Sequence, residues 1–322
     1  MQLRVPLVAL AMLVAASAHA ADEYPAHTIT LIVPFAAGGP SDVSGRALGD
    51  AMSKQLHETI IIENDGGAGG NIGATKAAHA KPDGYTMMFT NFSLALSPAL
   101  YDNLDYDAVK DFSSVGVAIF SATMLLARND LPPKTVPDLV TYLKTNGEKV
   151  LMATTGPGGP SDLCARLIMK ATDTKLTIVN YKGTAPAMTD LIPGHVDLLC
   201  DSVATAAPQV KAGIVKTYGV TGHQRSSFVP DVPTLVEQGL ASIDYTVWSA
   251  LYVPAKTPKP VLDRIVTAFQ GALKDPAFQK INASLGQEQA TGDLTTPAGA
   301  DAYLKSEMAR WTPLLKGSNS GN

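Results

Sequence analysis

The pentapeptide Gly-Gly-Pro-Ser-Asp occurs twice in the chain, and its residue types suit the binding of an anion. Residues 38–46 read GGPSDVSGR and residues 158–166 read GGPSDLCAR. The glycines allow a tight turn, the proline suits the first turn of a helix, and serine and aspartate are common where helices begin. A helix N-terminus offers free backbone N–H groups and a partial positive charge. Each copy therefore predicts a loop and a helix start that together hold an anion such as a carboxylate.

The repeat also has a purely structural interpretation, in which both copies are well-capped helix starts that bind nothing. After the shared pentapeptide, each copy continues with an aliphatic residue, two small residues and an arginine. Chance does not readily explain a match of this length in a chain without low-complexity segments. We therefore favour two similar lobes, each presenting a glycine loop to a shared cleft.

Apolar runs before the two loops predict the strands that position them. Residues 29–33 are rich in β-branched side chains, and residues 150–152 are apolar. Helices are expected from Ser41 to Met52 and over residues 161–171. Strands and helices alternate along the rest of the chain, which predicts βαβ units and mainly parallel sheets. The further expected strands are 59–64, 85–90, 177–181, 196–200 and 215–221, and the further expected helices are 74–80, 138–145 and 185–192.

Two apolar segments predict that the chain crosses between lobes. Residues 113–127 leave the first lobe and residues 248–253 return to it, and helices over 261–273 and 299–315 then pack on the first lobe. The fold class is α/β with two lobes, each a mainly parallel sheet with flanking helices. Ligands in such hinged proteins lie between the lobes, at the carboxyl ends of strands. The expected domains are 21–126 with 248–322 for lobe 1, and 127–247 for lobe 2.

The N-terminus predicts export. Arg4 precedes an apolar run over residues 5–16, and Ala18-His19-Ala20 forms an A-x-A cleavage site, so residues 1–20 are expected to be a signal peptide cleaved after Ala20. The 322 residues carry a formal net charge of −4 and no cluster of Lys and Arg, which argues against nucleic acid as a partner. No later stretch reaches the ~18 apolar residues of a membrane span.

The cysteines and histidines do not predict a metal or cofactor site. Cys164 and Cys200 are the two cysteines of the chain. Export permits a disulfide between them, but two buried thiols are the favoured interpretation. With six scattered histidines they supply too few ligands for a metal, so no metal and no cofactor is expected.

Glycines 67, 69 and 73 form a variant of the dinucleotide-binding fingerprint. They follow the second strand of the lobe, whereas the fingerprint belongs after the first. The acidic residue expected about 20 positions later is also missing. A tight loop that lines the cleft or packs a helix explains them better.

Polar residues at the loops and strand ends complete the predicted ligand site. Their hydroxyls and amides can satisfy carboxylate oxygens, while Phe35 and Phe92 can either stack on an aromatic acid or pack the lobe core. The predicted ligand-binding residues are Phe35, Ala36, Gly38, Gly39, Ser41, Asp42, Asn91, Phe92, Ser93, Thr154, Thr155, Gly156, Gly158, Gly159, Ser161, Asp162, Lys182, Asp201 and Ser202.

An exported hydrolase is an alternative from another functional class. It requires a nucleophile, a base and an orienting group. The chain has no G-x-S-x-G sequence, and its histidines lie in expected turns, linkers or helix ends without a partner constellation. We therefore expect no enzyme activity and no catalytic residue.

Five motifs along the chain resemble, in order, the Bug-type solute receptors of tripartite tricarboxylate transporters. They are IVPFAAGGPSD, IIENDGGAGGNIGA, KPDGYTM, VNYKGTAPAMTDLIPGHVDLLCDS and PDVPTLVEQGL. The resemblance covers the mature chain and implies a monomeric periplasmic binding protein of the two-lobed (Venus flytrap, type II-like) kind. It implies a carboxylate ligand, such as a dicarboxylate, tricarboxylate or aromatic acid, held by backbone amides and waters at residues 35–42 and 154–162. It also implies delivery to the membrane subunits of such a transporter. A receptor that signals through a membrane kinase would use the same binding physics and remains the alternative.

One departure from the family pattern concerns the second loop. Many members have Gly-Ser-x-x-His-Leu where this chain has Gly-Gly-Pro-Ser-Asp-Leu, so Asp162 replaces the histidine. An extra carboxylate would repel an anionic ligand unless it turns away or carries a proton. Either Asp162 caps its own helix, or the ligand presents a donor or a cationic group to it. The same question applies to Asp42.

Overall fold

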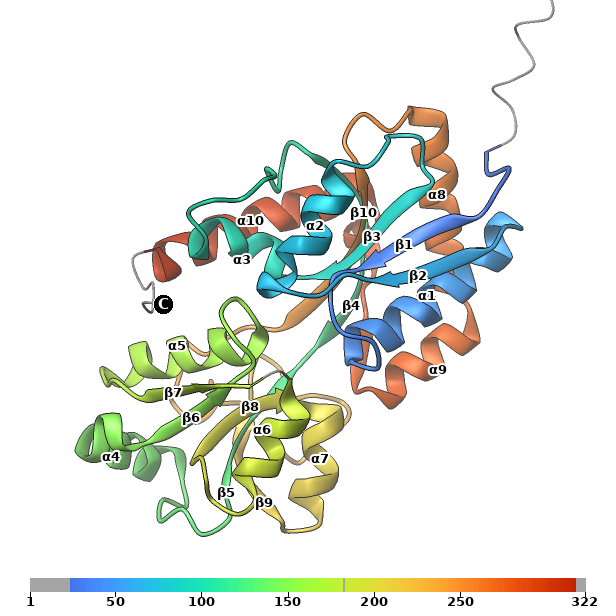
Figure 1. Cartoon of the computed structure of the whole chain (residues 1–322). Helices are drawn as coiled ribbons and strands as arrows, with labels where there is room; N and C mark the ends of the chain where they lie inside the picture. Colours follow the sequence, from blue (N-terminus) through green and yellow to red (C-terminus); the bar gives the residue numbers. More distant parts are fainter. Residues whose placement is uncertain (1–23, 182, 317–322) are drawn as a thin grey trace, which may run out of the picture.

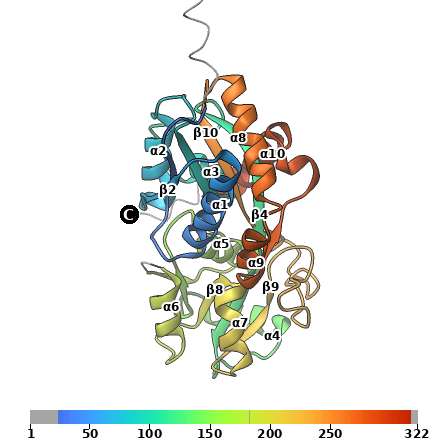
Figure 2. The ribbon, with the colours of Figure 1, turned by 90° about the vertical axis from the view of Figure 1, so that its right-hand side faces the viewer.

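The computed structural model describes residues 24–181 and 183–316, which form two mixed β-sheets with helices on both faces of each (Figures 1 and 2). The first sheet lies in the upper lobe of Figure 1 and the second in the lower lobe. The predicted signal peptide and Lys182 lie outside the described residues.

The first sheet has six strands in the order β11-β4-β10-β3-β1-β2. β1 pairs in parallel with β2 and β3, whereas β10 runs antiparallel to β3 and β4, and β11 antiparallel to β4. The strands are β1 (Ile29–Val33), β2 (Ile60–Asn64), β3 (Thr86–Asn91), β4 (Phe112–Ser121), β10 (Val247–Pro254) and β11 (Gln287–Gln289).

The second sheet has five strands in the order β7-β6-β8-β5-β9. β6 pairs in parallel with β7 and β8, and β5 runs antiparallel to β8 and β9. The strands are β5 (Thr123–Arg128), β6 (Leu151–Thr154), β7 (Thr177–Asn180), β8 (Leu198–Ser202) and β9 (Val215–Val220).

Helices cover both faces of each sheet because each sheet is apolar on both sides. On the first sheet, α1, α8 and α9 share one apolar cluster, and α2, α3 and α10 share another on the opposite face. On the second sheet, α6 and α7 cover one face and α4 and α5 the other. The helices are α1 (Pro40–Leu56), α2 (Asn71–Ala78), α3 (Ser93–Leu100), α4 (Val136–Asn146), α5 (Pro160–Thr172), α6 (Thr184–Leu191), α7 (Val203–Lys211), α8 (Lys259–Ala272), α9 (Pro276–Ser284) and α10 (Pro297–Leu315), with 3₁₀ turns η2 (Ala68–Gly70), η3 (Gly147–Lys149) and η4 (Gly292–Thr295).

The predicted two-lobed α/β architecture is confirmed, but the expectation of mainly parallel sheets is wrong. The crossing strands run antiparallel to their neighbours, because the chain must leave the first sheet and come back to it. The strand predicted over 113–127 is two strands, β4 in the first sheet and β5 in the second, separated by Ala122. The chain thus changes sheet before the boundary expected after residue 126, and the lobe bounds themselves stay a prediction.

The apolar core on the α3–α10 side continues from one lobe into the other. A single cluster of buried side chains includes Leu96 of α3, Trp311 of α10, Leu163 of α5 and Tyr245, which precedes β10. Trp311 packs edge-on against Tyr245, with ring centroids 6.5 Å apart. The two lobes therefore share hydrophobic core as well as connecting strands.

Cys164 and Cys200 form a disulfide that joins α5 to β8, so the expectation of two buried thiols is wrong. Their Cα atoms are 6.3 Å apart, and both side chains are buried. The pairing depends on α5 packing across β8, a long-range contact that two isolated cysteines in a sequence do not reveal.

The disulfide predicts that the purified exported protein contains no free thiol. Thiol titration of the unreduced protein in denaturant should detect none, and the Cys164→Ala/Cys200→Ala variant should lose about 3–4 kcal/mol of unfolding free energy through the larger entropy of its unfolded chain. Denaturant unfolding with and without reductant measures this loss. Two titratable thiols in the unreduced protein would contradict the bond.

Candidate functional site

Two glycine loops with the same backbone geometry connect strands to helices at equivalent places in the two sheets. The first glycine loop (residues 34–39) joins β1 to α1, and the second glycine loop (residues 155–159) joins β6 to α5. Gly38 has φ 81° and Gly158 has φ 82°, in the left-handed region that favours glycine. The residues before the two helices also match, with φ and ψ of −78° and 167° in the first loop and −81° and 167° in the second. The repeated sequence therefore folds into a repeated structure.

Asp42 holds the first glycine loop in place. Its Oδ2 accepts hydrogen bonds from the Gly38 amide (2.8 Å) and from Nε of Arg46 (3.0 Å), and its Oδ1 accepts one from Nδ2 of Asn64 (2.9 Å). Burial opposes the charged carboxylate, but the hydrogen bonds from Arg46, Gly38 and Asn64 outweigh it and hold the pKa of Asp42 below its ordinary value. Asp42 is thus an ionised side chain engaged within its own lobe.

Asp162 makes the equivalent contacts in the second glycine loop. Its Oδ2 accepts hydrogen bonds from the Gly158 amide (3.0 Å) and from Nε of Arg166 (2.8 Å). In neither loop, therefore, does the aspartate cap the amides of its own helix, which was one of the two interpretations of the sequence. The carboxylate reaches backwards to a loop amide, as the acidic residue of a capping box does, and an arginine one turn later offsets its charge.

The first amides of α1 and α5 have no hydrogen-bond acceptor within their own helices. The aspartates already engage the amides of Gly38 and Gly158. The amides of Ser41 and Asp42 in α1, and the corresponding pair in α5, lie in the first helical turn and have no carbonyl partner within the helix. A carboxylate placed before either helix would meet these donors and the positive end of the helix dipole.

Phe35 and Ala36 lie at the start of the first glycine loop, which packs against the glycine segment 66–73. A Cβ built on Gly66 would lie 3.3 Å from the Ala36 amide nitrogen, and one built on Gly73 would lie 2.7 Å from Cβ of Pro34. The glycines of this segment thus permit close packing against the first glycine loop. Phe35 is half-buried and Ala36 is exposed.

Asn91 and Ser93 lie at the carboxyl end of β3, beside the first glycine loop. The Ser93 amide donates to Oδ1 of Asn91 (3.0 Å), and both residues are buried. A Cβ built on Gly70 would lie 3.4 Å from Oγ of Ser93 and from Cζ of Phe35. The structure therefore brings these predicted residues of the first lobe together.

Thr154, Thr155 and Ser161 stabilise the second glycine loop. Oγ1 of Thr154 donates to Oδ1 of Asn180 at the end of β7 (2.6 Å) and accepts from the Gly156 amide (3.4 Å). The Thr155 amide donates to Oγ of Ser161 (2.9 Å), and the two hydroxyls are also 2.9 Å apart. These hydrogen bonds therefore fix the path of the second glycine loop.

Asp201 and Ser202 end β8, and their side chains contact the first residues of α6 and α7. Asp201 Oδ1 accepts from the Ser202 amide (2.8 Å) and its Oδ2 from Oγ1 of Thr205 (2.7 Å), and the Thr184 side chain at the start of α6 also bonds to it. Burial raises the pKa of Asp201 despite these donors. Oγ of Ser202 caps α7. Lys182, the remaining predicted residue, lies outside the described residues.

Contacts across the lobes meet at the second glycine loop. Oη of Tyr101, which follows α3, donates to the carbonyl of Pro157 (3.3 Å). A Cβ built on Gly69 would lie 3.0 Å from the same carbonyl oxygen, and one built on Gly158 would lie 3.3 Å from Cδ1 of Leu100. The first lobe therefore reaches the second glycine loop through η2 and the end of α3.

Phe92 packs in the core and is not available for stacking on a ligand. It is fully buried and stacks on Tyr245, with ring centroids 6.3 Å apart. Oη of Tyr245 contacts Oγ1 of Thr123 (2.8 Å) and donates to the carbonyl of Pro160, the first residue of α5 (3.1 Å). Tyr245 thus links the start of α3 to the start of α5. The sequence did not indicate this role of Tyr245, because a single tyrosine in a polar segment predicts no particular partner.

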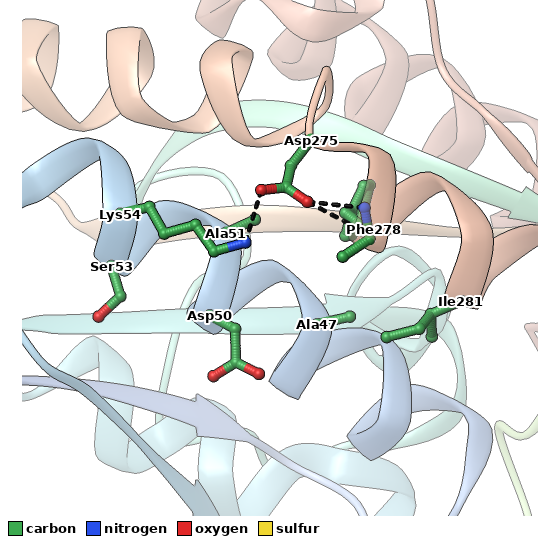
Figure 3. Close-up of a pocket in the computed structure, with 9 residues that line it drawn as sticks. Ala47, Asp50, Ala51, Ser53, Lys54, Asp275, Phe278 and Ile281 are labelled. Atoms are coloured by element: carbon green, nitrogen blue, oxygen red, sulfur yellow. Dashed lines mark hydrogen bonds and ion pairs between the residues drawn. The ribbon is translucent and has the colours of Figure 1, made fainter.

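Two surface hollows lie away from the glycine loops. One of about 370 Å³ lies between α1 and α9, where Lys54 and Asp275 form an ion pair of 2.8 Å (Figure 3). Another, of about 260 Å³, lies where the two sheets meet and includes His223 and Glu288. Among residues 24–181 and 183–316, no group of three or more His, Cys, Asp or Glu side chains could hold a metal ion. No helix in these two ranges is long and apolar enough to cross a membrane.

A family model described as the tripartite tricarboxylate transporter family receptor matches residues 45–319. The chain belongs to this family. The resemblance found in the sequence motifs is thereby confirmed, and receptors of this family are periplasmic solute-binding proteins. A protein of Agrobacterium vitis, encoded in the TAR-I ttuE-ttuC' intergenic region, is 44% identical over 92% of this chain and 86% of its own length.

Solved structures of family receptors share the fold over almost the whole chain. The periplasmic binding protein BugD is 38% identical, with a TM-score of 0.82 over 90% of this chain and 97% of its own. MatC from Rhodopseudomonas palustris, with bound malate, is 33% identical, with a TM-score of 0.83 over 91% of this chain and 100% of its own. Another R. palustris protein, with adipate, is 27% identical, with a TM-score of 0.82 over 91% of this chain and 97% of its own.

Substituting Gly38 is expected to reduce ligand affinity with little loss of stability. No atom lies within 4 Å of a Cβ at this position, so the Cβ of Gly38→Val has space and the substitution acts through backbone strain in the loop. The left-handed backbone costs a β-branched residue about 1–2 kcal/mol, enough to displace the loop from its binding geometry. Isothermal titration calorimetry, with an acid that binds the wild-type protein as the titrant, measures the affinity.

Gly213→Val is the matched control for Gly38→Val. Gly213 has φ 69° and equally open surroundings, and it follows α7, outside both glycine loops. The control should show a similar loss of stability with unchanged affinity. Equal affinities of the two variants would remove the first glycine loop from the ligand site.

The lowered pKa of Asp42 predicts how stability depends on pH. A carboxylate whose pKa is lower in the folded state stabilises the protein above its unfolded pKa, near 3.8 here, and loses that contribution as the pH falls through its folded pKa. The stability difference between the wild type and Asp42→Asn should therefore be largest above about pH 4 and shrink at lower pH. Urea unfolding at a series of pH values tests this. A difference that grows on acidification would contradict it.

Proposed function

We propose that this receptor captures a small aliphatic dicarboxylate between its two glycine loops and delivers it to the membrane subunits of a tripartite tricarboxylate transporter. The observation that carries the proposal is the repeated loop geometry, in which each lobe has a glycine turn followed by a helix start without a side-chain cap. Such a helix start offers amides to an anion. The malate and adipate in the two R. palustris relatives support this ligand class.

The donors available suit carboxylates in strength as well as in type. A hydrogen bond to an ionised group contributes about 1.5–3 kcal/mol net. Several such bonds, less the cost of ordering the ligand, reach the ~8 kcal/mol of micromolar binding. Two helix starts would divide this energy between the two ends of a dicarboxylate.

An aliphatic ligand is favoured over an aromatic acid because the aromatic side chains near the loops have other partners. Phe92 is buried against Tyr245, and Oη of Tyr101 donates to the Pro157 carbonyl. Phe35 is half-buried beside Gly70. Among the described residues, the groups left near the two glycine loops for a ligand are therefore mainly backbone amides and small side chains.

Binding without chemical conversion fits the placement of the histidines that contact carboxylates. His195 lies 3.3 Å from Asp190 and His223 lies 3.5 Å from Asp244, and both histidines are largely exposed. None of these four residues belongs to either glycine loop.

We further propose that the receptor works as a periplasmic monomer whose mature chain begins at Ala21.

A thermal-shift screen of small acids tests the proposed function. A dicarboxylate at about 100 times its Kd should raise the unfolding free energy by about 2.7 kcal/mol and the Tm by about 5 °C, because it binds only the folded protein. The panel should contain malate, adipate, citrate and benzoate, with sugars and amines as controls. Stabilisation by sugars or amines but by no acid would overturn the proposal.

A further inference from the structure

We propose that the Asp42–Arg46 and Asp162–Arg166 pairs position the two glycine loops and neutralise their own charge, so that an anion can bind beside an aspartate. This inference rests on the proposed function for its ligand. It assigns these four side chains to shaping the site rather than to touching the ligand, and it gives the repeated aspartate and arginine a common role.

The repetition of two hydrogen bonds to the aspartate in both lobes carries the inference. In each loop a left-handed glycine donates its amide to the aspartate four residues later, and an arginine four residues beyond that donates Nε to the same carboxylate oxygen. The two copies follow strands of separate sheets. After the shared pentapeptide they continue with different residues, Val-Ser-Gly in one and Leu-Cys-Ala in the other. A helix start needs no such arginine, so capping alone does not account for the pattern.

The arginine resolves the electrostatic conflict that an aspartate creates at an anion site. A lone carboxylate there would repel a carboxylate ligand and would also be costly to bury. Only 8% of the Asp162 side chain and 11% of the Arg166 side chain are exposed. The ion pair leaves the loop held by the aspartate and the net charge of the pair near zero.

The two pairs differ in their exposure to water, which predicts unequal sensitivity to substitution. The Arg46 side chain is 49% exposed. Asn64 accepts a hydrogen bond from Nη2 of Arg46 and donates one to Oδ1 of Asp42, so the first pair has a further partner. The Asp162–Arg166 pair is buried, where water screens its charges less. The charge of Asp162 also reaches the other lobe, because with burial it raises the pKa of Tyr101. The second pair should therefore control affinity more strongly than the first.

Amide hydrogen exchange tests the positioning role without any ligand. Asp162→Ala removes the acceptor of the Gly158 amide, so exchange in residues 156–159 should accelerate at least about tenfold, with the rest of the protein unchanged. Asp162→Asn retains an acceptor oxygen and should stay within about threefold of wild type. Wild-type exchange in the alanine variant would overturn the positioning role.

Affinity for malate, adipate or another acid that the thermal-shift screen identifies tests the neutralising role. Arg166→Gln leaves the Asp162 charge without its ion-pair partner Arg166 and should weaken binding roughly tenfold or more, with a larger loss at low salt. Asp162→Asn/Arg166→Gln removes both charges and should recover affinity to within about threefold of wild type. The same variants at Asp42 and Arg46 should show smaller changes.

The Lys54–Asp275 ion pair supplies a control. Lys54 lies in α1, as Arg46 does, but it lines the hollow of Figure 3 and not a glycine loop. Lys54→Gln should leave affinity unchanged. Wild-type affinity in Arg166→Gln, or no recovery in the double variant, would overturn the neutralising role. A wild-type protein that binds no acid would overturn the proposed function, while the hydrogen-exchange result would still decide the positioning role.

Discussion

The hydrogen bond from a left-handed glycine amide to an aspartate carboxylate fixes both halves of the candidate site. It sets the path of the chain between the strand and the helix, and thereby the direction in which the first helical amides point. The bond needs glycine for its backbone angle, aspartate for its reach, and arginine to make a buried carboxylate tolerable. Two such loops lie at the carboxyl ends of strands β1 and β6, one in each sheet, where each loop leads into helix α1 or α5.

The local parts of this arrangement could be predicted from the sequence. The repeated pentapeptide, the apolar runs before it and the helical spacing after it involve residues close together in the chain, so they predicted the loops and the two-lobed fold. Capping of their own helices by Asp42 and Asp162, one of the two interpretations that the sequence left open, was wrong in detail, because the sequence shows that a carboxylate is near a helix start but not which amide it reaches. The sequence alone leaves the role of Phe92 open between ligand stacking and core packing.

The remaining features depend on contacts between distant segments. The disulfide, the link from Tyr245 to Pro160 and the packing of Tyr101 against Pro157 join residues far apart in the sequence. α3 was missed because its residues are almost all buried and show no amphipathic period, and Ser93–Leu100 reads as a continuation of the preceding apolar strand. The mixed sheets follow from the returning strand β10, whose partners a single sequence does not name.

The apolar cluster shared by both lobes limits how the molecule can open. Separating the lobes as rigid blocks would part Tyr245 from Phe92 or Trp311 and leave a void in a dry interior. Any opening would therefore have to come from rotation in the crossing strands around Ala122 and Val247, with the shared cluster kept packed. The same continuity means that neither lobe, cut from the chain, would keep a closed interior, so the receptor is expected to fold as a single cooperative unit.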